Sequence, residues 1–153
     1  MDEDRMVAKL ADIEAIKQLK ARYFRLMDTK QWEAWGEVFS QDARLQWGES
    51  DSDSATGRAN IVSAVSQAID RAVTCHHGHM PEIEIVSAER ATGVWAMYDR
   101  VDHPDYLLEG YGHYNEEYVK VAGEWKIHRT RLTRLHRDFA LKRPAVDKPA
   151  GPQ

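Results

Sequence analysis

The hydrophobic pattern changes its period within residues 58–85, which read RANIVSAVSQAIDRAVTCHHGHMPEIEI. From about Arg58 to Ala72 the apolar residues recur at spacings of three and four, which is typical of an amphipathic helix. Its apolar stripe consists of Ile61, Val62, Val65 and Ile69. Beyond it apolar and polar residues alternate, which is typical of strands. The stretch therefore predicts helices in the first part of the chain and a sheet in the rest.

Two further helices are expected before this stretch. The segment DIEAIKQLKARYFRLMD begins at Asp12, which fits the N-cap position, and repeats the helical spacing of apolar residues. After a break at residues 29–31, WEAWGEVF predicts a shorter helix over residues 32–39 that docks through aromatic side chains. Residues 43–47, ARLQW, alternate like a strand, and the polar stretch that ends at Gly57 predicts a loop.

Four strands are expected after the third helix. Residues 80–101 predict two strands joined at residues 87–90, and residues 107–137 predict two longer strands that turn at residues 122–123. Helices followed by strands indicate an α+β fold, with the helices packed on one face of a mostly antiparallel sheet. A strongly twisted sheet around helices forms a cone with an apolar bottom and an open mouth, and ligand sites favour such concave places.

The composition argues against several classes of partner. The chain has 153 residues, the size of one domain, and its formal net charge of −4 comes from interspersed acidic and basic residues. This pattern indicates neither nucleic-acid nor membrane binding. Because no apolar run approaches the roughly 20 residues of a membrane span, and the N-terminus lacks a signal peptide's apolar stretch, we expect a cytoplasmic protein. The single cysteine, Cys75, cannot form an intramolecular disulfide.

Residues 75–79, CHHGH, hold the single cysteine and three of the seven histidines, and three interpretations are open. Zinc ligation needs three or four ligands, and strand alternation puts His77 and His79 on one face with Cys75 beside them. The other histidines, however, form no recognisable metal spacing. The imidazoles could instead lie on a half-exposed strand. In the third interpretation one of them, His76 first, accepts a proton from a substrate carbon while a carboxylate holds its tautomer.

Three residues outside this motif are candidates for the same chemistry. Asp28 ends the first helix, where a carboxylate interacts unfavourably with the helix dipole, so it either bonds to the backbone of residues 29–30 or serves a site. Tyr23 is either a core aromatic or a proton donor. Asp99 ends the apolar stretch GVWAMYD. On the inner face it would be a carboxyl at the edge of an apolar pocket, where burial favours the protonated acid.

The order and spacing of these residues resemble the SnoaL-like branch of the nuclear transport factor 2-like superfamily. The likeness is to its lyases, the bile-acid 7α-dehydratases, hexachlorocyclohexane dehydrochlorinase and, more remotely, scytalone dehydratase, and it covers about Ile13 to Arg137. The family's catalytic Asp falls on Asp28 within RLMDTKQWEAW, and its His falls on His76 within TCHHGHMPEIEIVSA. Tyr23 and Asp99 match the additional Tyr and Asp of the bile-acid dehydratases.

The resemblance implies a cone-shaped, cystatin-like α+β barrel, with a curved, mostly antiparallel mixed sheet around three N-terminal helices. A single SnoaL-like domain would span residues 1–141, and residues 142–153 would be a flexible or subunit-packing tail. It also implies a homo-oligomer, with a trimer favoured over a dimer.

The activity that the resemblance implies is an elimination that needs no cofactor and no metal. His76 would remove a proton from a carbon next to a carbonyl or a leaving group, and Asp28 would hold its ring. Tyr23 and Asp99 would protonate or polarise the departing hydroxyl.

Two assignments stay open within the resemblance. A family arginine on the last strand corresponds to Arg129 or Arg131, of which we assign Arg131, and His77 competes with His76 as the base. The substrate is expected to be hydrophobic and cyclic, such as a steroid or a polyketide. The residues expected to contact it are Phe24, Met27, Trp47, Val65, Ile69, Trp95, Met97 and Tyr111.

Other functions fit the same residues. An isomerase or a polyketide cyclase would use the same Asp-His dyad. A small-ligand-binding module would need no chemistry, since function resides in the site and not in the fold. A metal-dependent enzyme is the remaining alternative.

Overall fold

The computed structural model describes residues 2–144, which form three helices and six strands. The helices are α1 (Glu3–Asp28), α2 (Trp32–Gly36) and α3 (Arg58–Ile69). The strands are β1 (Phe39–Gln46), β2 (Ser54–Thr56), β3 (Val73–Ile85), β4 (Arg90–Asp102), β5 (Tyr106–Val121) and β6 (Glu124–Leu141).

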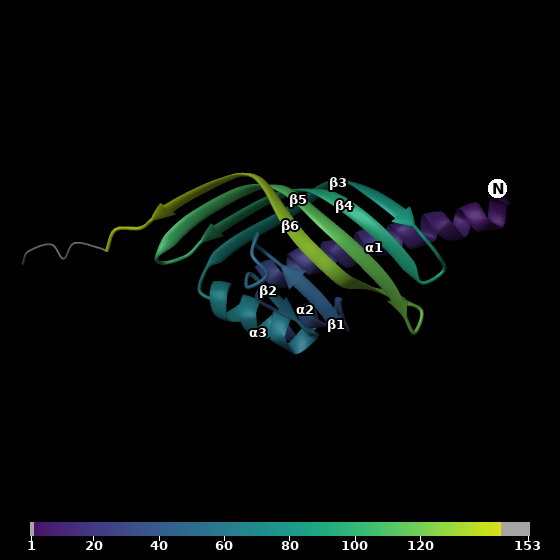
Figure 1. The fold of residues 1–153 in the computed structure, drawn as a ribbon, viewed down its shortest axis with the longest axis horizontal. Coiled ribbons are helices and arrows are strands. Elements are labelled where there is room, and N and C mark those ends of the chain that lie inside the picture. Colours follow the sequence, from purple (N-terminus) through teal and green to yellow (C-terminus); the bar gives the residue numbers. More distant parts are fainter. Residues whose placement is uncertain (1, 145–153) are drawn as a thin grey trace, which may run out of the picture.

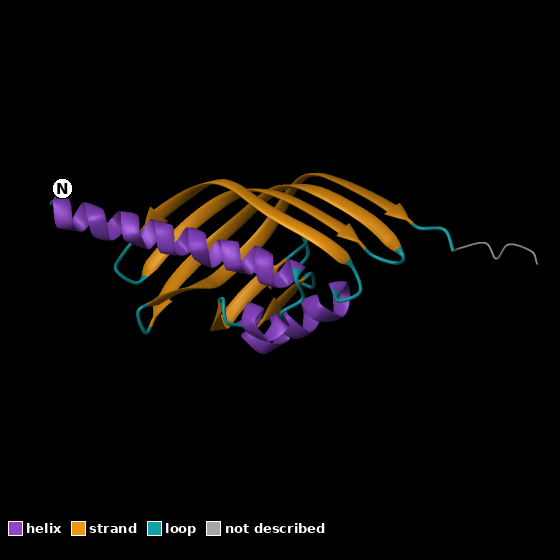
Figure 2. Cartoon of the chain, turned by 180° about the vertical axis from the view of Figure 1, so that it is seen from behind, coloured by secondary structure: helices purple, strands orange, loops and turns teal. Residues whose placement is uncertain are grey.

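All six strands belong to one sheet, in the order β2-β1-β6-β5-β4-β3. Neighbouring strands are antiparallel except β1 and β6, which are parallel. The sheet is strongly curved, and the helices lie on its concave side (Figures 1 and 2). The predicted α+β fold is confirmed. Because β2 and β3 are the two sheet edges, the cone stays open along one side and is not a closed barrel.

Helix α1 packs its apolar face against the sheet, and its opposite face is exposed to solvent. The buried apolar residues on it are Ile16, Leu19, Tyr23, Leu26 and Met27. The helix begins at Glu3, so the prediction that Asp12 caps it is wrong. The Asp12 carboxylate instead accepts hydrogen bonds from Lys120 Nζ (2.7 Å) and Trp125 Nε1 (2.8 Å). Figure 2 shows the N-terminal end of α1 extending past the sheet.

Aromatic packing closes the bottom of the cone. The Trp35 ring of α2 lies 4.9 Å from Phe39 and 5.6 Å from Tyr23, between ring centroids. The predicted docking of this helix through aromatic side chains is thus confirmed. The helix is shorter than the predicted residues 32–39, because it ends at Gly36 and β1 begins at Phe39. Edge-on and tilted contacts of this kind stabilise a core beyond the area they bury.

A β-bulge in β6 decides which of its residues face the helices. The register with β5 shifts between Glu117 and Tyr118, so His128 is an extra residue on β6. Ile127 is buried before the bulge, and Thr130 is buried after it. Because side chains alternate with a period of two, the extra residue exchanges the inner and outer positions of the strand as far as a second register shift, at Leu135.

Smaller differences from the predicted elements occur at segment ends. Helix α3 ends at Ile69 and not at Ala72, and the predicted loop before it contains β2. Lys142, the first residue of the predicted tail, donates its backbone N–H to the Asp105 carbonyl (2.9 Å). Residues 145–153, most of that tail, lie outside the described residues. Among the helices of residues 2–144, none has the length and apolar composition that a membrane crossing requires.

Candidate active site

A cavity of about 240 Å³ lies between α3 and the concave face of the sheet. Its apolar wall consists of Met27, Leu45, Trp47, Ala64, Val65, Ala68, Ile69, Val101, Leu108 and Leu132. Its polar lining residues are Tyr23, His76, Asp99, Tyr114 and Arg134. Larger hollows, of about 540 Å³ over β3–β6 and 950 Å³ beside α1, have charged residues scattered around them. An apolar wall with a few convergent polar groups is the better mark of a ligand site.

The first pair of polar residues joins the end of α1 to β3. His76 Nδ1 lies 2.7 Å from Asp28 Oδ1, and the His76 backbone N–H donates to Asp28 Oδ2 (2.9 Å). Since a carboxylate only accepts, the pair assigns the ring proton to Nδ1 and leaves the Nε2 lone pair as the acceptor. Asp28 therefore does not bond to the backbone of residues 29–30, one of the two arrangements that the sequence left open.

Hydrogen bonds keep Asp28 ionised despite its partial burial. Burial raises the pKa of this carboxyl, but donation from the His76 ring, the His76 backbone and Thr74 outweighs burial, so the pKa lies below 3.8. Thr74 Oγ1 donates to Asp28 Oδ1 (2.9 Å) and accepts from Lys30 Nζ (2.7 Å). A carboxylate held this way fixes the imidazole and stabilises the imidazolium that forms when the ring accepts a proton.

The CHHGH motif divides between the two faces of β3. His76 is 8 % exposed on the inner face, and His77 and His79 are exposed on the outer face. Cys75 is also on the outer face, with Sγ 3.2 Å from His77 Nε2. His77 therefore cannot replace His76 in the cavity. Residues 2–144 contain no group of three or more His, Cys, Asp or Glu side chains that could hold a metal ion.

Tyr23 lines the cavity one and a half turns before Asp28 on α1. Its side chain is 3 % exposed, and burial, followed by the charges of Glu116 and Asp99, raises its pKa well above 10.0. The phenol therefore stays protonated at physiological pH and can donate a hydrogen bond to a ligand.

Asp99 and Arg134 form a second charged pair in the cavity wall. Arg134 Nη1 and Nη2 each lie 2.8 Å from one Asp99 oxygen, a bidentate arrangement. The hydrogen bonds that Arg134 donates to Asp99 raise the pKa of Arg134 further, against the effect of burial. A Cβ at Gly110 would overlap both side chains, so this glycine makes room for the pair. Asp99 lies on the inner face, as the sequence allowed, and both of its oxygens accept hydrogen bonds from Arg134, a partner that the sequence did not predict.

The assignment of Arg131 to the site is also corrected. Arg131 and Arg129 are exposed on the outer face, where both line the hollow over β3–β6. Counting alternate residues from the buried Ile127 would turn both arginines inward, but the bulge at His128 reverses the faces. The arginine in the cavity is Arg134.

A protein-family model described as the SnoaL-like domain matches residues 8–131, most of the chain. The chain belongs to this family.

Solved structures support the same fold at low sequence identity. A protein provisionally named a scytalone dehydratase, from Novosphingobium aromaticivorans, is 21% identical with a TM-score of 0.81, over 96% of this chain and 99% of that one. A hexachlorocyclohexane dehydrochlorinase from Novosphingobium barchaimii is 18% identical with a TM-score of 0.74, over 94% and 99%. A nuclear transport factor 2-like protein with a cystatin-like fold, from N. aromaticivorans, is 20% identical with a TM-score of 0.71, over 88% and 90%. At these identities the likeness shows the fold alone.

In this SnoaL-like chain, half of the residues expected to contact a substrate line the cavity: Met27, Trp47, Val65 and Ile69. The other four lie elsewhere. Phe24 packs under β3, where a Cβ at Gly78 would come within 2.7 Å of its ring. Trp95 and Met97 are on the inner face, as their alternation with Asp99 allowed, but they are buried in the core away from the cavity. Tyr111 is 43% exposed on the outer face.

Sequence reasoning missed two polar residues of this SnoaL-like site, Tyr114 and Arg134. Alternation along β5 could have found the first, since Gly110, Gly112 and Tyr114 share the inner face. For Arg134 no local signal exists, because the bulge in β6 follows from pairing with β5 and leaves no mark in the composition of the strand.

Proposed function

We propose that this SnoaL-like protein is a cofactor-independent lyase that eliminates water, or a comparable leaving group, from a hydrophobic cyclic molecule. The observation that carries the proposal is the Asp28–His76 pair, with Nδ1 to Oδ1 at 2.7 Å, in the wall of an apolar cavity. An oriented, neutral imidazole beside an apolar ligand is suited to removing a proton from carbon.

Proton abstraction is assigned to His76. Its Nε2 lone pair takes the proton, the electrons of the broken C–H bond form the new C=C bond, and the bond to the leaving oxygen breaks. Asp28 holds the ring and stabilises the imidazolium. The proton from His76 is then passed to the departing hydroxide, so that water leaves and the imidazole is neutral again.

Stabilisation of the leaving oxygen is assigned to Tyr23 and Arg134. Tyr23 is a protonated donor in the cavity wall. Arg134 uses one N–H of each terminal nitrogen on Asp99, which leaves N–H groups for a ligand. Donors placed where negative charge develops are among the largest contributions to catalysis, of the order of 2.7–4 kcal/mol each. Asp99 acts in this scheme by holding Arg134 and not as an acid.

The test is product analysis on a panel of one- to four-ring hydroxylated and halogenated compounds. Elimination is expected to yield an alkene, and deuterium at the abstracted position is expected to slow turnover. His76→Ala should lower kcat by at least about 10²-fold. His77→Ala, the neighbouring histidine on the outer face, is the matched control and should leave kcat unchanged. Equal losses in both variants would contradict the proposal, and rearranged or cyclised products would favour an isomerase or cyclase.

Further parts of the proposal concern the setting of the enzyme. A cytoplasmic location, a trimeric assembly, and independence of metals and cofactors stay predictions. Gel filtration with light scattering tests the assembly, and elemental analysis of active protein tests the metal.

A further inference from the structure

One of the residues that line the cavity carries a buried hydroxyl without a hydrogen-bond partner among residues 2–144. Among the side chains of residues 2–144, three have a buried polar atom without a hydrogen-bond partner: Trp35, Tyr114 and Thr130. Of these, only Tyr114 lines the cavity, and its side chain is 0% exposed. A buried polar group without a partner destabilises a fold, so its retention at a ligand site calls for an explanation.

The ring that carries this hydroxyl is held from three directions. Its centroid lies 6.1 Å from that of Tyr23 and 5.6 Å from that of Phe24. Lys20 Nζ lies 3.8 Å from the same centroid, and this ammonium is itself fixed by Glu116 Oε2 at 2.8 Å. These contacts pack the Tyr114 ring tightly between α1 and the sheet.

The hydroxyl is a donor at every physiological pH. Burial first, then the negative charges near it and Tyr23, raise the pKa of Tyr114 well above 10.0. A phenol that stays protonated and has no acceptor among residues 2–144 is available to donate a hydrogen bond to a ligand that supplies an acceptor.

The size of the cavity limits what that ligand can be. About 240 Å³ is the volume of about eight water molecules at ~30 Å³ each. It lies below the range of roughly 300–1,000 Å³ that accommodates drug-sized molecules. One or two rings fit, whereas a four-ring steroid needs more room.

We propose that the Tyr114 hydroxyl binds an oxygen atom of the substrate, and that this substrate is a hydroxy or keto compound of one or two rings. The inference deepens the proposed function and rests on it, because the bound ligand is a substrate only if the protein is the proposed lyase. It adds to the proposed function the Tyr114 hydroxyl, which binds substrate independently of the Asp28–His76 pair. It also adds the size of the substrate, one or two rings.

The experiment compares two probes that share a two-ring skeleton and differ in one carbonyl oxygen, 2-tetralone and tetralin. Calorimetry gives the Kd of each for the full-length protein. The wild type is expected to prefer 2-tetralone, and Tyr114→Phe should reduce that preference about tenfold through weaker binding of 2-tetralone alone. The Tm of this variant should stay unchanged or rise, because the substitution removes the unsatisfied hydroxyl.

Tyr118→Phe is the matched control on the same face of β5. The Tyr118 hydroxyl already donates to Glu116 Oε1 (2.7 Å) and accepts from Trp95 Nε1 (2.9 Å), and it does not line the cavity. This variant should lose thermal stability and keep the preference for 2-tetralone.

Three results would overturn the inference: an unchanged preference in Tyr114→Phe, no binding of either probe to the wild type, or tighter binding of a four-ring ketosteroid than of 2-tetralone. The His76→Ala variant separates this inference from the proposed function, because it should lose turnover and still prefer 2-tetralone over tetralin. Absence of turnover with every compound, together with a Tyr114-dependent preference, would refute the lyase and leave the oxygen-binding role intact.

Discussion

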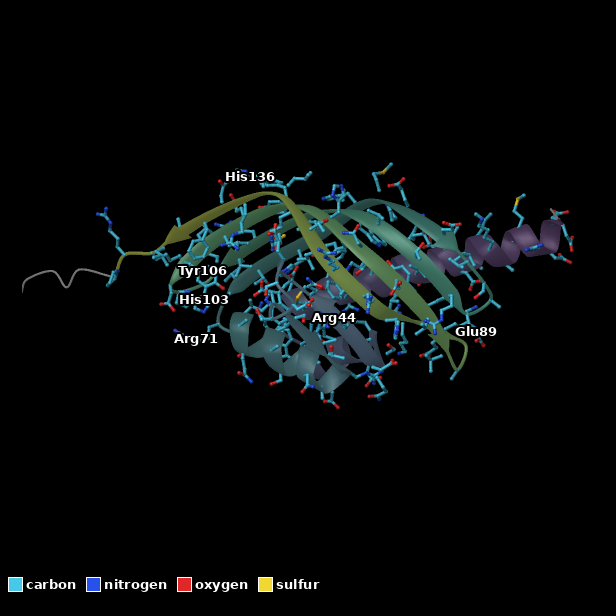
Figure 3. The ribbon with its side chains drawn as sticks, viewed as in Figure 1. Arg44, Arg71, Glu89, His103, Tyr106 and His136 are labelled. Carbon is cyan, nitrogen blue, oxygen red and sulfur yellow. The ribbon has the colours of Figure 1, made fainter. Side chains whose placement is uncertain are left out.

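The two faces of the β3–β6 sheet carry the same residue types with different consequences. On the outer face His77, Tyr98, Tyr111 and His136 stand opposite one another across the strands, with neighbouring ring centroids 5.4 to 6.2 Å apart. Figure 3 shows His136 on the convex side of the sheet. On the inner face His76 and Tyr114 line the cavity, together with Tyr23 of α1. Histidine and tyrosine are therefore not in themselves the mark of the site.

The difference lies in burial and in fixed partners. The outer pair His136–Asp138 has Nε2 to Oδ1 at 2.9 Å, with both side chains more than 60% exposed. The inner pair His76–Asp28 has a similar distance, 2.7 Å, with side chains 9% and 22% exposed. Water competes for the outer hydrogen bond and screens its charge, whereas the inner pair keeps one tautomer and one orientation. The same two functional groups are thus prepared for chemistry only on the inner face.

The largest expected effect tests this contrast at the two Asp-His pairs. Asp28→Asn should lower kcat by about 10³–10⁴-fold, because an amide no longer selects the Nδ1–H tautomer or stabilises the imidazolium. Asp138→Asn, the same change in the outer pair, should leave kcat unchanged. Steady-state kinetics on both variants measures the contrast, which disappears if the two lose activity equally.

The next effect concerns two adjacent glutamates that face opposite sides of β5. Glu116 pairs with Lys20 at 2.8 Å, and both side chains are 0% exposed. Glu116→Ala should destabilise the fold by about 3–5 kcal/mol, because it leaves a buried ammonium without its partner. Glu117 pairs with Arg129 at 3.7 Å in solvent, so Glu117→Ala should cost less than about 1 kcal/mol.

Urea unfolding of the two glutamate variants measures this difference. Similar urea midpoints for Glu116→Ala and Glu117→Ala would contradict the expectation that the buried ion pair contributes more stability than the exposed one. Lys20→Met in the Glu116→Ala background should recover part of the lost stability, since it removes the unpaired charge.

A smaller effect is expected from filling the space beside the second charged pair. A methyl group in Gly110→Ala would displace Arg134 from Asp99, at a cost of about 1–3 kcal/mol in stability and with reduced turnover. His113→Ala, on the outer face of the same strand, is the control. Kinetics and thermal unfolding check both variants, and wild-type kcat in Gly110→Ala would remove the Asp99–Arg134 pair from the mechanism.

The smallest expected effect is the acid dependence of stability that Asp28 contributes. Its pKa in the folded protein is below 3.8, so its hydrogen bonds stabilise the fold at higher pH. That stabilisation should be lost as the pH falls from about 3.8 through the lower pKa of the folded state. The gap in unfolding free energy between wild type and Asp28→Asn should therefore shrink in acid. A gap that is constant down to pH 2 would contradict the hydrogen-bonded carboxylate.

Much of the fold could be predicted from local patterns. The spacing of apolar residues in α1 and α3, and the turn at residues 122–123, reflect a helical period, a strand period and a hairpin, all of which are local properties. Helix ends were less predictable. The first turns of α1, before Asp12, carry Met6, Val7 and Leu10 on the surface and form a helix that protrudes from the domain (Figure 2).

For the site, the resemblance selected Asp28 and His76, and alternation left the face of Asp99 open. In the structure His76 and Asp99 fall on inner positions of β3 and β4. Arg131 and Tyr111 were assigned to the wrong face, the first because of a β-bulge that only the pairing with β5 reveals. The partner of Asp99 was also missed, since Arg134 lies 35 positions away in the chain.

What the sequence by itself determined is the order of helices and strands and the residue types available to the cavity, because hydrophobic period and side-chain chemistry are properties of short segments. What only the tertiary structure decided is which of those side chains meet: Asp28 meets His76 across 48 positions, and Asp99 meets Arg134. The Tyr114 hydroxyl has no hydrogen-bond partner within residues 2–144. The physical reason is that a strand's inner and outer faces are set by its register with its neighbours, and one bulged residue exchanges them.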